Sequence, residues 1–234
     1  MIWETPTKIF DDSGETMFSE KIYKEVDSAI KRVWLEDIKE DYLRHSLLKE
    51  DSLKNAFYYH LRRRLGDHYL LDNHLRIYTE FYYMGLRADL VVVKLNENPG
   101  QNGHLKNDVA EIIAAIEMKY KYDLSDKPFL SDIEKIRKSI EEYKINALYY
   151  LAFIHEVEYE ANSTLSWIDI EKSPWAKGRV VELNGYFVTE KQDPVWEVVS
   201  YNGLNEEIFR RGNYGNEERK DNPAFSVSSI RETF

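Results

Sequence analysis

Two stretches of the chain decide the fold: RADLVVV at residues 87–93 and IIAAIEMK at residues 112–119. Each contains an apolar run of strand length with charged residues at one end, as expected of a strand buried in a sheet. Side chains alternate between the two faces of a strand, so Glu117 and Lys119 project to one side while Met118 points to the other. Because unpaired buried charges are costly, these residues either neutralise one another or serve a metal ion and a reaction.

Composition limits the class of protein. A chain of 234 residues is long enough for one sizeable core and is cramped for two full domains. Its formal net charge of -10 argues against indiscriminate binding of nucleic acid, which depends on cations that neutralise phosphates. The absence of cysteine excludes disulfides and thiolate metal sites. No apolar stretch approaches the roughly 20 residues that span a bilayer, and the N-terminus does not resemble a secretory signal, so we expect a cytoplasmic protein with no membrane partner.

Hydrophobic periodicity surrounds the two stretches with further elements. Helical spacing of apolar residues predicts helices over 19–35, 50–65 and 132–144. Apolar and β-branched runs predict strands over 76–83, 87–94, 109–122, 147–154 and 195–201. A strand, a helix and a strand in succession indicate a parallel crossover. The sequence therefore predicts an α/β fold with a mixed central β-sheet flanked by α-helices.

Three regions are expected along the chain. They are an N-terminal helical segment packed on the core (1–48), the α/β core itself (49–202) and an irregular C-terminal tail (203–234). Within the core, Ser131-Asp132-Ile133-Glu134 matches a capping box, which predicts that a helix begins there. Asn184-Gly185 lies between two apolar runs, which is typical of a two-residue hairpin turn within residues 179–190.

Asp89 and Glu117 lie at the charged ends of strands that the chain connection makes neighbours. Two carboxylates brought together repel unless a cation lies between them, and hard oxygen ligands favour Mg²⁺ or Mn²⁺. Lys119 would complete the group, because an ammonium there can orient or deprotonate an attacking water and stabilise charge on a phosphoryl transition state. The pattern therefore predicts a site where a divalent metal ion and an ammonium act together on an attacking water.

This order of elements resembles the PD-(D/E)XK nuclease superfamily. The pattern of that family is an acidic helix, a strand ending in Asp, a strand carrying Glu/Asp-x-Lys, then a helix and a strand, and it matches from Glu50 to about Ile154. Ala88 stands where the proline that names the family would be, a position that makes no catalytic contact there. The resemblance implies a restriction-endonuclease-like fold.

The resemblance also implies roles for individual residues. Asp89 and Glu117 match the metal-binding acids, Lys119 matches the catalytic lysine, and the Met118 carbonyl matches a further metal ligand. Glu50 looks like the helix acid that members of the family often add to the metal site. Acidic residues in a first helical turn also suit the helix dipole, so a capping role is the alternative for Glu50.

Further candidates surround this group. Glu80 is either an additional metal contact or the partner of Arg76 or Arg87 in an ion pair. The candidate nucleic-acid contacts are basic side chains, namely Arg62, Arg63, Arg64, Lys121 and Lys135. Their structural alternatives are a solvated helix end for the three arginines, strand-end packing around Lys121 and a solvated helix face for Lys135.

The function expected from these observations is hydrolysis of phosphodiester bonds in nucleic acid, with DNA as the expected substrate and Mg²⁺ or Mn²⁺ as the cofactor. The alternative is a catalytically inactive nuclease-like scaffold whose acidic surface binds a basic protein. The net charge of -10 and the lack of a separate DNA-reading motif favour that alternative. A homodimer or a different protein partner would suit such a subunit.

Overall fold

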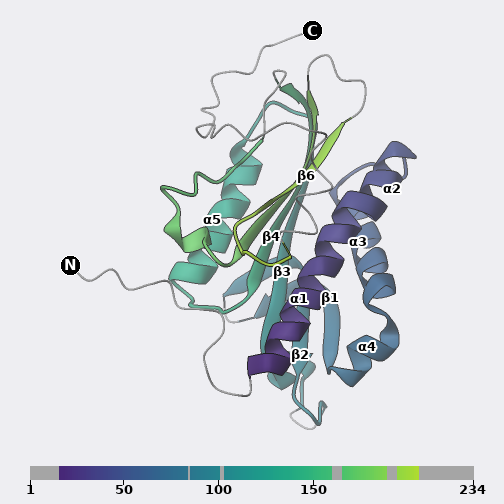
Figure 1. Ribbon diagram of the computed structural model, residues 1–234, viewed down its shortest axis with the longest axis vertical. Helices are drawn as coiled ribbons and strands as arrows, with labels where there is room; N and C mark the ends of the chain where they lie inside the picture. The colour runs from purple at the N-terminus through teal and green to yellow at the C-terminus, as the bar shows by residue number, and fades with distance from the viewer. Residues whose placement is uncertain (1–15, 84, 101–102, 160–164, 189–193, 206–234) are drawn as a thin grey trace, which may run out of the picture.

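The computed structural model describes residues 16–83, 85–100, 103–159, 165–188 and 194–205. These residues form strands β1 (Leu75–Tyr83), β2 (Leu86–Leu95), β3 (Val109–Lys121), β4 (Leu148–Tyr159), β5 (Val180–Val188) and β6 (Val195–Ser200) (Figure 1). The strands build one mixed sheet in the order β1-β2-β3-β4-β5-β6. The pairs β3–β4 and β4–β5 are parallel and the other three pairs are antiparallel. The predicted α/β class with a mixed central sheet is confirmed.

Helices connect and flank these strands. They are α1 (Thr16–Arg32), the π-helical segment η1 (Val33–Ile38), α2 (Lys39–Leu43), α3 (Glu50–Leu65), α4 (Asp67–Asp72) and α5 (Lys127–Glu141), with short 3-10 turns η2 (Leu105–Asp108) and η3 (Pro174–Ala176). No helix within the described ranges is both long enough and apolar enough to cross a membrane.

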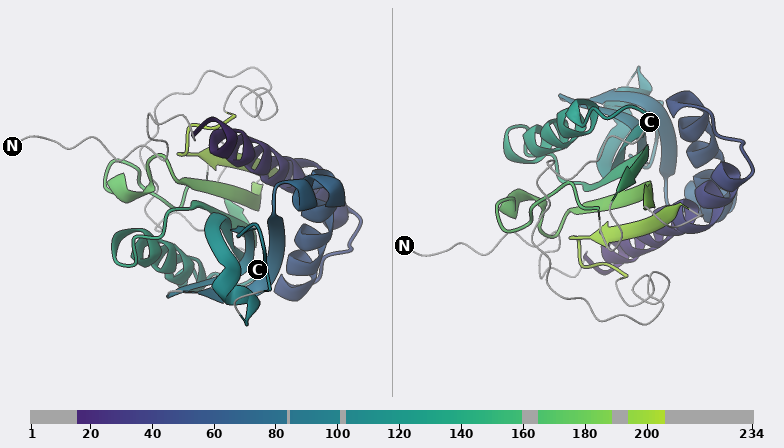
Figure 2. Two further views of the ribbon diagram at one scale, coloured as in Figure 1. Left: turned by 90° about the horizontal axis from the view of Figure 1, so that it is seen from below. Right: turned by 90° about the horizontal axis from the view of Figure 1, so that it is seen from above.

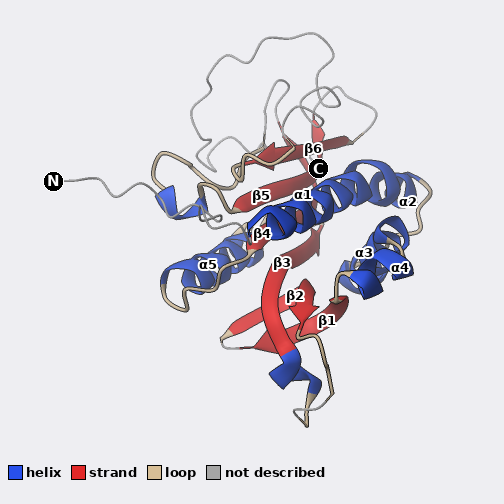
Figure 3. Cartoon of the chain, turned by 60° about the horizontal axis from the view of Figure 1, so that its bottom comes forward, coloured by secondary structure: helices blue, strands red, loops and turns tan. Residues whose placement is uncertain are grey.

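Helices cover both faces of the sheet (Figures 2 and 3). Side chains of α1, η1 and α3 pack on one face, where Ile116 and Met118 of β3 are fully buried. The other face carries α5 and the segment around η3, with Phe129 of α5 buried among strand residues. Because side chains alternate along β3, Glu117 and Lys119 lie on the face that α5 covers.

Of two helices predicted next to the site, one lies where the sequence places it and the other begins earlier. The predicted helix over 50–65 coincides with α3, which ends at Gly66, where φ is 80° and a side chain would be strained. The prediction that the next helix begins near Asp132 is wrong, because α5 already begins at Lys127. Pro128 lies in the first turn of α5, where its missing N–H and fixed φ suit helix initiation. Asp132 therefore lies in the helix interior instead of in its first turn.

The predicted hairpin at Asn184-Gly185 is also wrong. Both residues lie inside β5, which continues from Val180 to Val188. Tertiary contacts override the turn signal: the Asn184 side chain donates a hydrogen bond to the Leu165 carbonyl at 2.9 Å. Asn184 and Gly185 are buried between β4 and β6, so a turn there would break the sheet.

Gly185 makes room for a neighbouring aromatic ring, which gives a testable expectation. A Cβ at Gly185 would lie 3.1 Å from Cη2 of Trp196, whose ring is held 4.7 Å from that of Trp34. We expect Gly185→Ala to lower the free energy of unfolding by about 1–3 kcal/mol through overpacking, as measured by urea denaturation. The combination with Trp196→Phe should recover part of this loss, whereas strictly additive losses would contradict the steric explanation.

Candidate functional site

The candidate residues meet where β2 and β3 separate. β2 pairs with β3 as far as Leu90 opposite Ile116, while β3 continues along β4 to Lys121. The C-terminal part of β3 thus leaves β2, and the two strands form a fork. Asp89 lies at the branch, where its Oδ2 accepts a hydrogen bond from the Met118 backbone N–H at 2.7 Å. This bond fixes the carboxylate beside the strand that carries the second predicted acid.

Lys54 reaches Asp89 from α3. Its Nζ lies 3.1 Å from Asp89 Oδ1 and also donates a hydrogen bond to the Glu80 carboxylate. Glu80 is therefore in an ion pair, but with Lys54 instead of the predicted Arg76 or Arg87. Burial lowers the pKa of Lys54, but its hydrogen bonds to the two carboxylates outweigh this effect and leave the pKa raised. Lys54 is charged at neutral pH.

Lys119 lies between carboxylates from two different helices. Its Nζ is 3.1 Å from Glu50 Oε2 on α3 and 3.3 Å from Asp132 Oδ2 on α5. Burial lowers the pKa of Lys119, but the charges and hydrogen bonds of Asp132 and Glu50 raise the pKa by more than burial lowers it, so the net shift is upward. A protonated amine suits stabilisation of negative charge and does not suit proton abstraction.

Glu117 is buried beneath α5. Its side chain is 6% exposed, and its Oε2 lies 3.5 Å from Nζ of Lys135, which also binds Asp132 Oδ1 at 2.6 Å. Burial raises the pKa of Glu117 to about 8; Lys135 opposes this shift, while the charges of Asp89 and Asp132 add to it. An added cation beside Glu117 would oppose this shift, as Lys135 does, because it favours the ionised carboxylate.

The raised pKa of Glu117 predicts a pH-dependent stability in metal-free buffer. Between its ordinary value of 4.5 and about 8, the folded protein keeps a proton that the unfolded chain has released. Stability should therefore fall as pH rises through this window. We expect Glu117→Gln to be more stable than wild type by about 1–3 kcal/mol above pH 8, with the difference vanishing near pH 4.5. Urea denaturation in EDTA across this range measures it, and a constant difference would contradict the assignment.

Eight charged residues thus meet at the fork, and we call them the fork cluster. They are five carboxylates, Glu50, Glu80, Asp89, Glu117 and Asp132, and three amines, Lys54, Lys119 and Lys135. All predicted catalytic and metal-binding side chains belong to it, as does Lys135 of the predicted nucleic-acid contacts. Lys121 lies two residues beyond Lys119 on the same face of β3.

Lys54 and Asp132 were not recognised from the sequence. Lys54 follows Glu50 by four residues, so the two share one face of α3, and this spacing was the available signal. Asp132 is 2% exposed and precedes Lys135 by three residues on α5. The sequence around Asp132 matches a capping box, a pattern that predicts a helix start and does not indicate an inward-facing side chain.

The three arginines on α3 lie away from the fork cluster. These arginines lie in the last turn of α3, roughly 20 Å along the helix axis from its first residue. Each is paired with an acid: Arg62 binds Asp67 at 2.7 Å, while Arg63 and Arg64 share Asp37. The structure does not bring these arginines to the predicted site.

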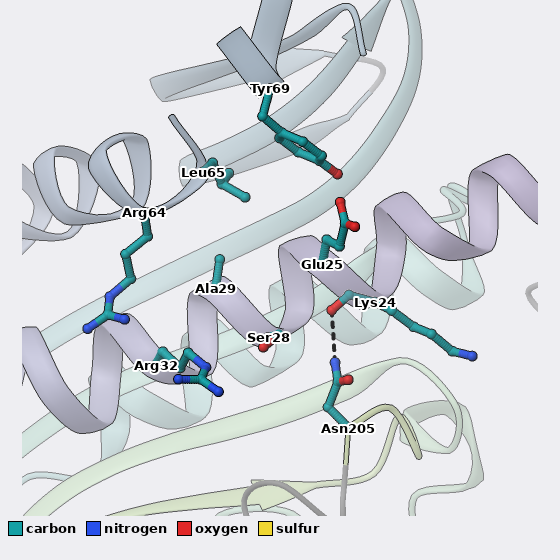
Figure 4. A pocket seen from close by; sticks show the side chains of 9 residues that line it. All are labelled: Lys24, Glu25, Ser28, Ala29, Arg32, Arg64, Leu65, Tyr69 and Asn205. Atoms are coloured by element: carbon teal, nitrogen blue, oxygen red, sulfur yellow. Dashed lines mark hydrogen bonds between the residues drawn. The ribbon is translucent and has the colours of Figure 1, made fainter. Parts of the chain in front are cut away.

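A groove of about 570 Å³ lies between α1 and the C-terminal part of α3 (Figure 4). Its basic residues have acidic partners, since Arg64 binds Glu36 at 2.6 Å and Lys24 binds Glu20 at 2.6 Å. None of its lining residues belongs to the fork cluster. The groove is therefore separate from the predicted site.

The donor atoms at the fork suit a small hard cation. Within the described ranges, no group of three or more histidine or acidic side chains is arranged to hold a metal ion. Asp89, Glu117 and the Met118 carbonyl instead offer two carboxylates and one main-chain oxygen. Mg²⁺ is commonly held by one or two carboxylates and completed by waters and substrate phosphates. The buried Glu117, whose pKa its acidic neighbours help to raise, fits such a cation.

Comparison of the whole chain with protein-family models, with curated proteins and with solved structures finds no match. The case for a function therefore depends on the fold and on the geometry of the fork cluster.

Proposed function

We propose that this protein is a metal-dependent nuclease with a restriction-endonuclease-like fold that hydrolyses phosphodiester bonds in DNA. One observation carries the proposal: Asp89, Glu117 and Lys119 lie together at a fork between two strands. The order of the surrounding helices and strands also supports the proposal. A helix that begins with an acid precedes these strands, and a helix and a parallel strand follow them.

The chemistry follows from the groups at the fork. A divalent cation held by Asp89, Glu117 and the Met118 carbonyl, with Glu50 beside them, would polarise the phosphoryl group and lower the pKa of an attacking water. Lys119 remains protonated and is oriented by carboxylates on both sides. It would stabilise the negative charge that develops on the phosphoryl oxygens.

Lys135 supports a route for the substrate. Its side chain is 47% exposed and lies beside the buried Glu117 and Asp132. A substrate phosphate approaching from solvent would meet this ammonium before it reached the acids. Lys135 would then bind the phosphate while Asp132 holds the amine in place.

The test is cleavage of plasmid DNA, single-stranded DNA and RNA by the full chain with Mn²⁺ or with EDTA. Wild type should cleave DNA only with the metal, and Asp89→Asn should abolish cleavage. Asp72→Asn makes the same change at an exposed position of α4 and should cleave like wild type. Absence of cleavage by wild type on every substrate would reject the nuclease function.

A catalytically inactive scaffold is the second candidate, and one observation favours it. Lys54, Lys119 and Lys135 already neutralise carboxylates of the fork cluster without a metal ion. A scaffold of this kind would cleave no nucleic acid and would bind Mn²⁺ equally, or not at all, in wild type and Asp89→Asn. Its partner would be a basic protein surface that complements the net charge of -10.

A further inference from the structure

Both carboxylate oxygens of Asp89 are engaged. Oδ2 accepts the Met118 N–H at 2.7 Å, which ties it to β3. Oδ1 lies 3.1 Å from Lys54 Nζ, and the Lys54 side chain is only 11% exposed. The Lys54 ammonium thus neutralises the oxygen of Asp89 that has no main-chain donor.

Glu80 provides a second partner for the same ammonium. The register of β1 and β2 passes from Thr79 opposite Leu90 to Phe81 opposite Ala88, which places Glu80 across from Asp89. Glu80 has a φ of 51°, a left-handed conformation that is uncommon for a residue other than glycine and that costs about 1 kcal/mol or more. This backbone distortion within a strand accompanies the contact between the Glu80 carboxylate and Lys54.

We propose that Lys54 is an exchangeable cation: it neutralises Asp89 in the metal-free protein and is retained by Glu80 alone when a divalent cation binds Asp89. This inference rests on the proposed function, because it concerns the same metal site. Glu80 is then a positioning residue for Lys54 and is not a metal ligand.

The exchange keeps every charge paired in both states. Asp89 always has a cation, either Lys54 or the metal ion, and Lys54 always has Glu80. Without Glu80, an ammonium that is largely buried would be left beside a divalent cation, and both burial and repulsion would oppose metal binding. The competition also makes metal affinity weaker than the acids alone would give.

The experiment is isothermal titration calorimetry of Mn²⁺ into wild type, Lys54→Met, Glu80→Gln and the double variant, at neutral pH without nucleic acid. Removing the competing ammonium should lower the Kd of Lys54→Met about tenfold relative to wild type. Glu80→Gln should raise the Kd, and this increase should largely disappear in the Lys54→Met background. Lys49→Met removes an exposed lysine from the start of the same helix and should leave the Kd close to that of wild type.

The outcomes separate this inference from the nuclease proposal. Wild type that binds Mn²⁺, with Lys54→Met binding no more tightly, overturns the exchange and leaves the metal site standing. If Glu80→Gln raises the Kd equally with and without Lys54, Glu80 is a direct metal ligand, and this result also overturns the exchange. Binding in neither wild type nor any variant rejects both the metal site and the exchange. Thermal unfolding monitored by circular dichroism confirms that each variant is folded.

Discussion

Replacement of Lys119 by methionine is expected to lower the rate of DNA cleavage by about 10²- to 10³-fold, the usual cost of removing one donor that stabilises a transition state. The loss should fall on kcat, because the ammonium acts where charge develops. The fold should persist, since Asp132 keeps Lys135 as a partner at 2.6 Å. Single-turnover cleavage of plasmid DNA with Mn²⁺ measures the effect.

Lys94→Met is the matched control for this variant. Lys94 is a partly buried lysine on β2, opposite Leu75 and Glu111 and away from the fork. The Lys94→Met variant loses a positive charge from the same sheet, as Lys119→Met does, so it should cleave DNA at the wild-type rate. Equal loss in both variants, or wild-type cleavage by Lys119→Met, would remove Lys119 from the mechanism.

The second large effect is expected at a buried ion pair outside the fork. Lys31 and Asp27 on α1 are 0% exposed, and their charged atoms lie 2.9 Å apart. Lys31 also donates a hydrogen bond to the Leu204 carbonyl at 2.7 Å, and Asp27 accepts one from the Tyr150 hydroxyl at 2.9 Å. The pair therefore links α1 to β4 and to the segment after β6. We expect Lys31→Met to cost about 3–5 kcal/mol, because it leaves a buried carboxylate without its cation.

Chemical denaturation of three variants tests this expectation. Asp27→Asn combined with Lys31→Met removes both charges, so the double variant should be more stable than Lys31→Met alone. Lys24→Met removes an exposed lysine of the same helix and should change stability by less than about 0.5 kcal/mol. A loss below about 1 kcal/mol in Lys31→Met would show that the pair does not hold α1 to the sheet.

The sequence predicted those parts of the fold that local patterns control. The period of apolar residues located α3 residue for residue, because Gly66 ends it with a backbone that suits glycine. Apolar runs located β2 and β3, and adjacency of the two strands brought Asp89 and Glu117 together. The α/β class with a mixed sheet followed from the same patterns.

The rest depended on contacts between distant segments. The spacing of Lys54 from Glu50 places both on one face of α3, but the packing of this face against the fork depends on tertiary contacts that no local pattern indicates. The apparent capping box at Asp132 and the apparent turn at Asn184-Gly185 both gave wrong predictions, because tertiary packing overrode these local signals. The predicted tail includes residues 206–234, which lie outside the described residues.

Calorimetric titration of Mn²⁺ into wild type, Asp89→Asn and Asp72→Asn at neutral pH tests the metal site without a substrate. We expect saturable binding to wild type and to Asp72→Asn, and loss of that binding in Asp89→Asn while its circular dichroism spectrum is unchanged. Binding of equal strength in all three proteins, or none in wild type, would contradict a metal site built on Asp89 at the fork of β2 and β3.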